Sequence, residues 1–141
     1  MIRKTVTVPL DPARAFDLFA RRLGDWWPVE SHSVAAGRGE RPAAVTVEPR
    51  EGGLIYETAQ NGERTQWGRV ARWAPGERLD LDWWPGRTEA DASRVSVRFV
   101  PEQGGTRVDL THAGLGPDRT QTYRTGWGAV LSAYRGAFAA A

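Results

Sequence analysis

The 141-residue chain carries 19 Lys and Arg against 17 Asp and Glu, a formal net charge of +2. These charges are spread without a basic run, so composition does not indicate a nucleic-acid partner. The chain has no Cys, which excludes disulfides and thiolate metal sites, and no window is apolar enough to span a membrane. Its length fits one domain over residues 1–141, and with no apolar targeting segment we expect a cytoplasmic protein without membrane contact.

The first part of the chain predicts a strand, a short helix and a long loop. Apolar and polar residues alternate over residues 1–8, as in a half-buried strand. Asp11 is a suitable N-cap with Pro12 at the first helical position, and the helix is expected to reach about Leu23. Residues 29–42 are polar and contain Gly and Pro, which predicts a mobile loop that controls the entrance to a pocket.

From Ala43 onward, alternating segments separated by turn signals predict six further strands, and Asn61-Gly62 is a strong hairpin signal. Successive strands joined by tight turns pair antiparallel. Alternation places Trp83 inward and Trp84 outward. For the strand over residues 63–73 the inward face stays open, because Trp67, Arg69 and Trp73 share one side and another Arg lies on the other.

Residues 119–138 predict a long amphipathic helix. Its apolar stripe has helical spacing and consists of Tyr123, Trp127, Val130, Leu131, Tyr134 and Phe138. Gly126 and Gly128 each weaken the helix by up to about 1 kcal/mol but let backbone or a ligand approach Trp127. Because the stripe must be buried against the sheet, we predict an α+β helix-grip fold: a curved antiparallel sheet of about seven strands around the C-terminal helix, with short helices after strand 1.

A set of ordered motifs covers nearly the whole chain. They are Trp26-Trp27-Pro28, Gly52-Gly53, the segment 67–84, the strand with Gly105, Thr106, Val108 and His112, and Gly126-Trp127. With them the chain resembles the SRPBCC superfamily (START/birch-allergen-like helix-grip proteins), closest to single-domain relatives of the activators of heat-shock-protein-90 ATPase. The resemblance implies a cavity between sheet and long helix. It implies less about activity, because the superfamily includes lipid carriers, hydrophobic-ligand binders, polyketide cyclases and co-chaperone domains.

Seven Trp residues predict an aromatic-lined pocket for an apolar or planar ligand, the alternative being that large rings fill the core. His112 is in phase with Val108 and Leu110, so we expect it to face the cavity as a recognition group, or to be bonded nearby in a structural role. The expected ligand-binding residues are Trp27, Tyr56, Trp67, Arg69, Trp73, Trp83, His112, Tyr123 and Trp127.

Other polar groups carry weaker signals. His32 and Glu57 are expected to face water, the alternative for Glu57 being a general acid or base if it is buried. The two His residues are far apart and there is no acidic cluster with ligand spacing, so no metal site or cofactor is expected. No Gly-x-Ser-x-Gly motif is present, and no catalytic residue is assigned.

Three functions remain open. The first is a binding module for a small hydrophobic molecule, oriented by Arg69, His112 or Tyr56. The second is a co-chaperone-like interaction module with a chaperone or other protein as partner, using Trp84 or residues 29–42; it predicts a filled cavity and an exposed apolar patch. The third is a cyclase- or hydrolase-like enzyme. We rank them in this order, for a monomer or homodimer.

Overall fold

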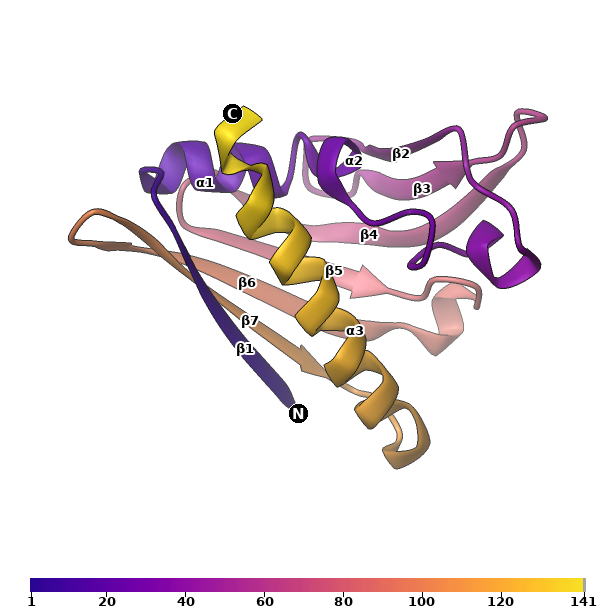
Figure 1. Cartoon of the computed structure of the whole chain (residues 1–141). Coiled ribbons are helices and arrows are strands. Elements are labelled where there is room, and N and C mark those ends of the chain that lie inside the picture. The colour runs from indigo at the N-terminus through magenta and orange to yellow at the C-terminus, as the bar shows by residue number, and fades with distance from the viewer. Residues whose placement is uncertain (141) are drawn as a thin grey trace.

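The computed structural model describes residues 1–140, in which a seven-stranded antiparallel sheet curls around one long helix (Figure 1). The strands are β1 (Ile2–Val8), β2 (Ala44–Val47), β3 (Leu54–Thr58), β4 (Arg64–Ala74), β5 (Arg78–Trp83), β6 (Ser93–Glu102) and β7 (Gly105–Ala113). The helices are α1 (Pro12–Phe19), α2 (Leu23–Trp26) and α3 (Pro117–Gly136), with 3₁₀ turns η1 (Ala35–Arg38), η2 (Glu89–Asp91) and η3 (Ala137–Ala140). The predicted α+β helix-grip fold is confirmed.

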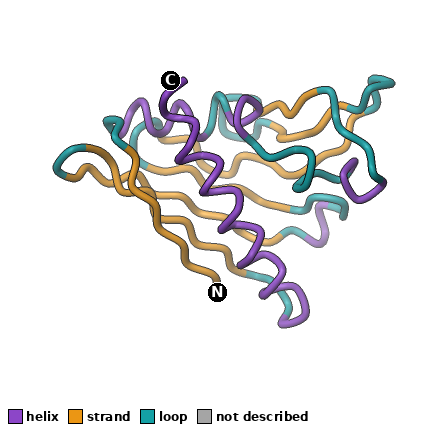
Figure 2. Tube along the Cα trace, viewed as in Figure 1, coloured by secondary structure: helices purple, strands orange, loops and turns teal. Residues whose placement is uncertain are grey.

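The sheet order is β1-β7-β6-β5-β4-β3-β2, with every neighbouring pair antiparallel. Strands β2 to β7 follow one another as hairpins. Strand β1 instead pairs with the distant β7, where Ile2 lies opposite His112. The C-terminal end of α3 lies near α1, and its other end lies beside the loops that follow β5 and β7 (Figures 1 and 2).

Helix α3 buries Trp127, Val130, Leu131 and Tyr134 against the sheet. The Tyr134 hydroxyl donates to the carbonyl of Ala15 at 2.8 Å, which ties α3 to α1. The stripe ends earlier than predicted: α3 stops at Gly136, and Phe138 lies in η3 with 41% of its surface exposed.

The first helix begins as predicted, since the Asp11 side chain accepts from the Arg14 amide at 2.8 Å and Pro12 opens α1. It does not run to Leu23. The chain leaves α1 after Phe19 and starts a second short helix, α2, which includes Gly24. A side chain on Gly24 would place its Cβ 2.2 Å from the carbonyl oxygen of Val45, so glycine lets α2 lie directly on β2.

Strand β4 contains two irregularities that break its alternation. Ile55 lies opposite Gly68 and Tyr56 opposite Gln66, which leaves Trp67 as an extra residue; a second shift falls between Val70 and Arg72. Bulges of this kind re-aim side chains. Trp67 and Trp73 therefore both pack into the core cluster, whereas Arg69 does not share their face.

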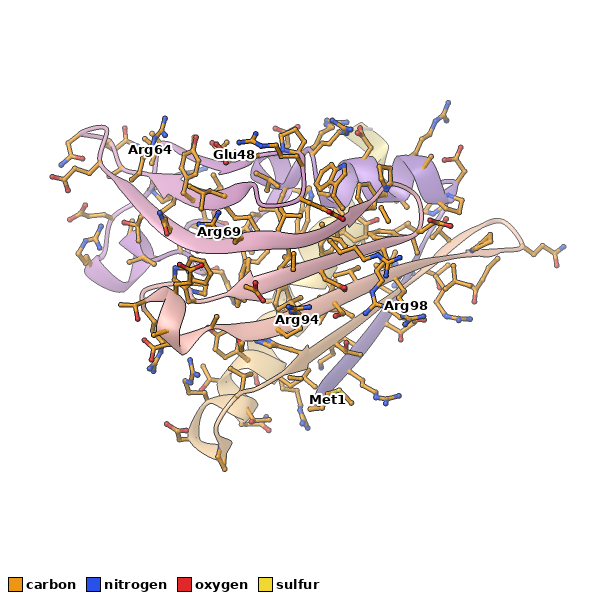
Figure 3. The ribbon with its side chains drawn as sticks, turned by 180° about the vertical axis from the view of Figure 1, so that it is seen from behind. Met1, Glu48, Arg64, Arg69, Arg94 and Arg98 are labelled. Carbon is orange, nitrogen blue, oxygen red and sulfur yellow. The ribbon has the colours of Figure 1, made fainter. Side chains whose placement is uncertain are left out.

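The opposite face of the sheet is charged. Figure 3 shows it from behind, with Arg69, Arg94 and Arg98 over the strands. Arg69 Nη1 donates to the carbonyl of Gly52 at 2.8 Å, and its Nε lies 3.5 Å from a Glu89 carboxylate oxygen.

Trp84 is buried, with only 2% of its surface exposed, but it is not part of the core cluster that contains Trp83. The chain leaves β5 after Trp83, and the Trp84 amide donates to the carbonyl of Trp67 at 2.6 Å. Within residues 1–140 no helix combines the length and apolarity needed to cross a membrane.

Candidate ligand-binding cavity

A cavity of about 450 Å³ lies between α3, the segment that follows α2, and the ends of β4 and β5. Its volume is in the range of small-molecule sites, and its accessible lining is predominantly apolar. Four of the predicted residues form an aromatic wall: Trp27, Trp67, Trp83 and Trp127. Tyr123 from α3 also borders it.

The four indoles of the aromatic wall contact one another. The centroids of Trp27 and Trp67 are 5.2 Å apart, and the remaining contacts, Trp27–Trp83, Trp27–Trp127, Trp67–Trp83 and Trp83–Trp127, lie at 5.8 to 5.9 Å. Tilted and edge-on aromatic pairs at these separations are favourable beyond the area they bury. The wall is thus one continuous aromatic surface contributed by α3, two strands and the end of α2.

Three of the four indole N–H groups have protein acceptors. Trp27 Nε1 donates to the carbonyl of His32 at 2.6 Å, and Trp67 Nε1 to Glu57 Oε1 at 2.7 Å. Trp127 Nε1 donates to His112 Nδ1 at 2.9 Å. These bonds fix the orientations of three of the four indoles in the aromatic wall.

His112 faces inward as expected but lies behind Trp127 rather than on the cavity lining, with 1% of its surface exposed. Because an indole can only donate, Nδ1 must accept and Nε2 must carry the hydrogen. Nε2 then donates to Ser93 Oγ at 2.7 Å, and Ser93 Oγ donates to the carbonyl of Trp83 at 3.1 Å. Burial, followed by the positive charge of Arg119, lowers the pKa of His112 to about 4, so the ring is neutral.

Glu57 is buried, contrary to the expectation that it faces water, with 2% of its surface exposed. Its Oε1 accepts from the Val34 amide at 2.6 Å as well as from Trp67, and Oε2 accepts from the Ala35 amide at 3.0 Å. One carboxylate thus joins β3, the aromatic wall and the start of η1. The available signal was its phase with Ile55, which alternation places on the same face and which is fully buried.

His32 also borders the cavity rather than lying fully in water. Its Nδ1 lies 2.7 Å from Ser31 Oγ. Its Cδ2 and Nε2 lie 3.7 and 3.8 Å from the position that a Cβ on Gly126 would occupy, so the ring rests against the bare backbone of α3. The predicted close approach at Gly126 is therefore made by a loop histidine. No sequence signal joins these two residues.

Three of the other predicted site residues, Tyr56, Trp73 and Arg69, lie away from the cavity lining. Tyr56 packs beneath the guanidinium of Arg64, 4.5 Å from the ring centroid, and Trp73 packs edge-on against Phe16 at 5.0 Å. Arg69 belongs to the charged outer face. Tyr123 packs edge-on against His112 at 4.9 Å, and burial raises its pKa.

Comparison with known proteins agrees with this architecture. Residues 10–135 match the family described as activator of Hsp90 ATPase homolog 1-like protein. The chain belongs to this family. No curated protein sequence matches it significantly.

Solved structures of similar fold include some with low and some with higher sequence identity to this chain. The Aha1 dimer from Colwellia psychrerythraea, solved in solution, is 16% identical with a TM-score of 0.71, over 96% of this chain and 93% of that one. Protein NE0264 from Nitrosomonas europaea is 13% identical with a TM-score of 0.67, over 95% and 90%. The anthrahydroquino-gamma-pyrone synthase Txn09, solved with a bound ligand, is 35% identical with a TM-score of 0.57, over 81% and 76%.

Proposed function

We propose that the protein binds a small planar hydrophobic molecule against the aromatic wall. The observation that supports this most strongly is the open cavity of about 450 Å³ beside four indoles, each of which contacts at least two of the others. Such a surface presents large apolar area at fixed positions, so binding orders few side chains.

The glycines of α3 offer a matched test of this function. Gly126 borders the cavity, whereas the nearest group to a Cβ on Gly128 would be Lys4 Nζ at 3.9 Å. Leu at either position improves helix propensity by a similar amount, up to about 1 kcal/mol, but only Gly126→Leu occupies cavity space.

Anthraquinone-2-sulfonate is a suitable soluble three-ring probe, and quenching of tryptophan fluorescence reports its binding. We expect Gly126→Leu to weaken binding at least tenfold and Gly128→Leu to change it less than twofold. Equal affinity in both variants would place the probe outside the cavity and contradict the proposal.

Chemistry on a polycyclic aromatic molecule is the second candidate function. It is favoured by the 35% identity to a synthase whose name describes a fused, oxygen-bearing aromatic product. His32 and Tyr123 are the groups at the cavity capable of exchanging a proton with such a ligand. Turnover of the Txn09 substrate by the wild type, lost in His32→Gln while probe binding is kept, would support this function. Binding without turnover would leave the protein a carrier.

A co-chaperone-like role finds less support in the surface. It predicted a filled cavity and an exposed apolar patch that uses Trp84 or residues 29–42, and Trp84 is buried. Among residues 1–138, the exposed large hydrophobic residues are Met1 and Phe138. An interaction with a chaperone would therefore use a polar or charged surface, such as the outer face of the sheet.

A further inference from the structure

We propose that Trp83 Nε1 is the recognition donor of the cavity, and that the ligand carries a hydrogen-bond acceptor oxygen, such as a quinone carbonyl, where it meets the aromatic wall. This inference rests on the proposed binding function and adds to it a chemical requirement. It assigns Trp83 a role different from that of the other three indoles.

The four indoles of the aromatic wall differ in one respect. Trp27, Trp67 and Trp127 donate to His32, Glu57 and His112, respectively. Trp83 Nε1 has no acceptor within residues 1–140, although only 3% of the residue is exposed. An indole N–H needs a partner when it is buried, so its partner must come from outside the chain.

The position of this N–H group follows from its accessibility. Over the same residues, no side-chain nitrogen or oxygen atom is both fully buried and without a partner. Trp83 Nε1 therefore retains contact with open space, and Trp83 borders the cavity. We infer that the N–H opens into the cavity, where water serves it until a ligand arrives.

The hydroxyl of Ser33, which also borders the cavity, already has hydrogen-bond partners within the chain. Ser33 Oγ donates to the carbonyl of Val29 at 2.6 Å and accepts from the Ala36 amide at 3.0 Å. Among the four indoles of the aromatic wall, the one with a free N–H is that of Trp83. Because an indole has no acceptor atom, a carbonyl, ether or phenol oxygen satisfies it, whereas a hydrocarbon edge does not.

Selectivity follows from the cost of displacing water. A pure hydrocarbon that covers Trp83 Nε1 displaces its water and leaves the N–H without a hydrogen-bond partner. An oxygenated ligand replaces that water with its own acceptor oxygen. Sites built around a hydrogen bond discriminate strongly against analogues that lack it. We expect a preference of roughly 5- to 100-fold for the oxygenated member of a matched ligand pair.

Anthraquinone-2-sulfonate and anthracene-2-sulfonate form such a pair, because they share three fused rings and the same charge but differ in the two carbonyl oxygens. Their affinities are to be measured by calorimetry for the wild type, Trp83→Phe and Trp73→Phe. Trp73→Phe is the matched control, since it also removes one indole from the core but lies away from the cavity lining.

We expect the wild type to bind the anthraquinone more tightly than the anthracene. Trp83→Phe should abolish this preference by weakening the binding of the anthraquinone alone. Trp73→Phe should retain the preference. In the wild type, the indole ¹⁵N–¹H resonance of Trp83 should move with the anthraquinone and much less with anthracene, a readout that does not depend on the stability of a variant.

Failure of the proposed binding function and failure of the recognition role of Trp83 give different results. If neither probe binds the wild type, the proposed binding function falls and this inference with it. If both bind with equal affinity, or if Trp83→Phe retains the preference, binding stands and the recognition role of Trp83 is overturned.

Discussion

The indole Nε1 of Trp127 donates to Nδ1 of His112 at 2.9 Å and thereby determines which nitrogen of the imidazole carries hydrogen. The opposite nitrogen then donates to Ser93, so both ring positions are used in the neutral form. Protonation would add a hydrogen at Nδ1 directly against the indole donor. His112 accordingly acts as a fixed support for one wall of the cavity.

This support predicts a pH-dependent stability. The pKa of His112 is about 4 in the folded protein and 6.5 as its ordinary value, so between these values the unfolded chain binds more protons. The contribution is complete above about pH 6.5 and is lost as the pH falls to about 4. At about 1.4 kcal/mol per pKa unit, the loss from this residue is on the order of 3 kcal/mol.

Urea denaturation from pH 4 to 7 is the measurement, with His112→Gln as the comparison. The Gln side chain can accept from Trp127 and donate to Ser93 but does not titrate. The stability difference between wild type and variant should therefore grow as the pH rises. Parallel curves would contradict a neutral, buried His112.

Trp127→Ala should destabilise the protein by about 3–5 kcal/mol, because the residue is 3% exposed, contacts two other indoles and is the donor to His112. Gln121→Ala, at an exposed position of the same helix, is the control. Chemical denaturation decides; a loss below about 1 kcal/mol for Trp127→Ala would place its indole outside the packed core.

Glu57→Gln should cost about 1–3 kcal/mol, because an amide NH₂ group would replace one of two oxygens that face N–H donors. Hydrogen exchange should accelerate at the amides of Val34 and Ala35, which donate to Glu57 in the wild type and should be protected there within the segment 29–42 that we predict to be mobile. Glu63→Gln on the neighbouring exposed turn is the control. Fast exchange of both amides in the wild type would contradict the anchor.

Gly68→Ala should be among the most destabilising alanine substitutions in the sheet. Its Cβ would lie 2.2 Å from the carbonyl oxygen of Asp82, so the pairing of β4 with β5 would have to shift beside Trp67. Gly136→Ala, whose Cβ would meet nothing within 4 Å, should instead stabilise α3 by up to about 1 kcal/mol. Thermal midpoints compare the two; equal midpoints would refute the close contact at Gly68.

The elements of this fold are readable from the sequence where burial on one face imposes a period. The stripe from Trp127 to Tyr134 and the alternation through Leu79, Leu81 and Trp83 are of this kind, and all seven buried positions agree with the structure. The capping of α1 by Asp11 is equally local. These signals need no knowledge of the partner surface.

The site was less accessible to such reasoning because its decisive contacts join distant segments. The β4 bulge at Trp67 depends on how β3 pairs with it, so strict alternation wrongly grouped Arg69 with the tryptophans. Glu57 and His32 meet their partners only when the segment after α2 folds across the sheet. Neither the β4 bulge nor the placement of the segment after α2 can be inferred from the spacing of residues in the sequence.

The pairing of β1 with β7 has a consequence for the order in which the chain can fold during synthesis. Ile2 must wait until His112 has been made, and α3, which covers the tryptophans of the sheet, follows later still. Until the ribosome releases α3, the indoles on β4 and β5 have no helix to cover them. Nascent chains of this protein should therefore depend on chaperone protection for most of their translation.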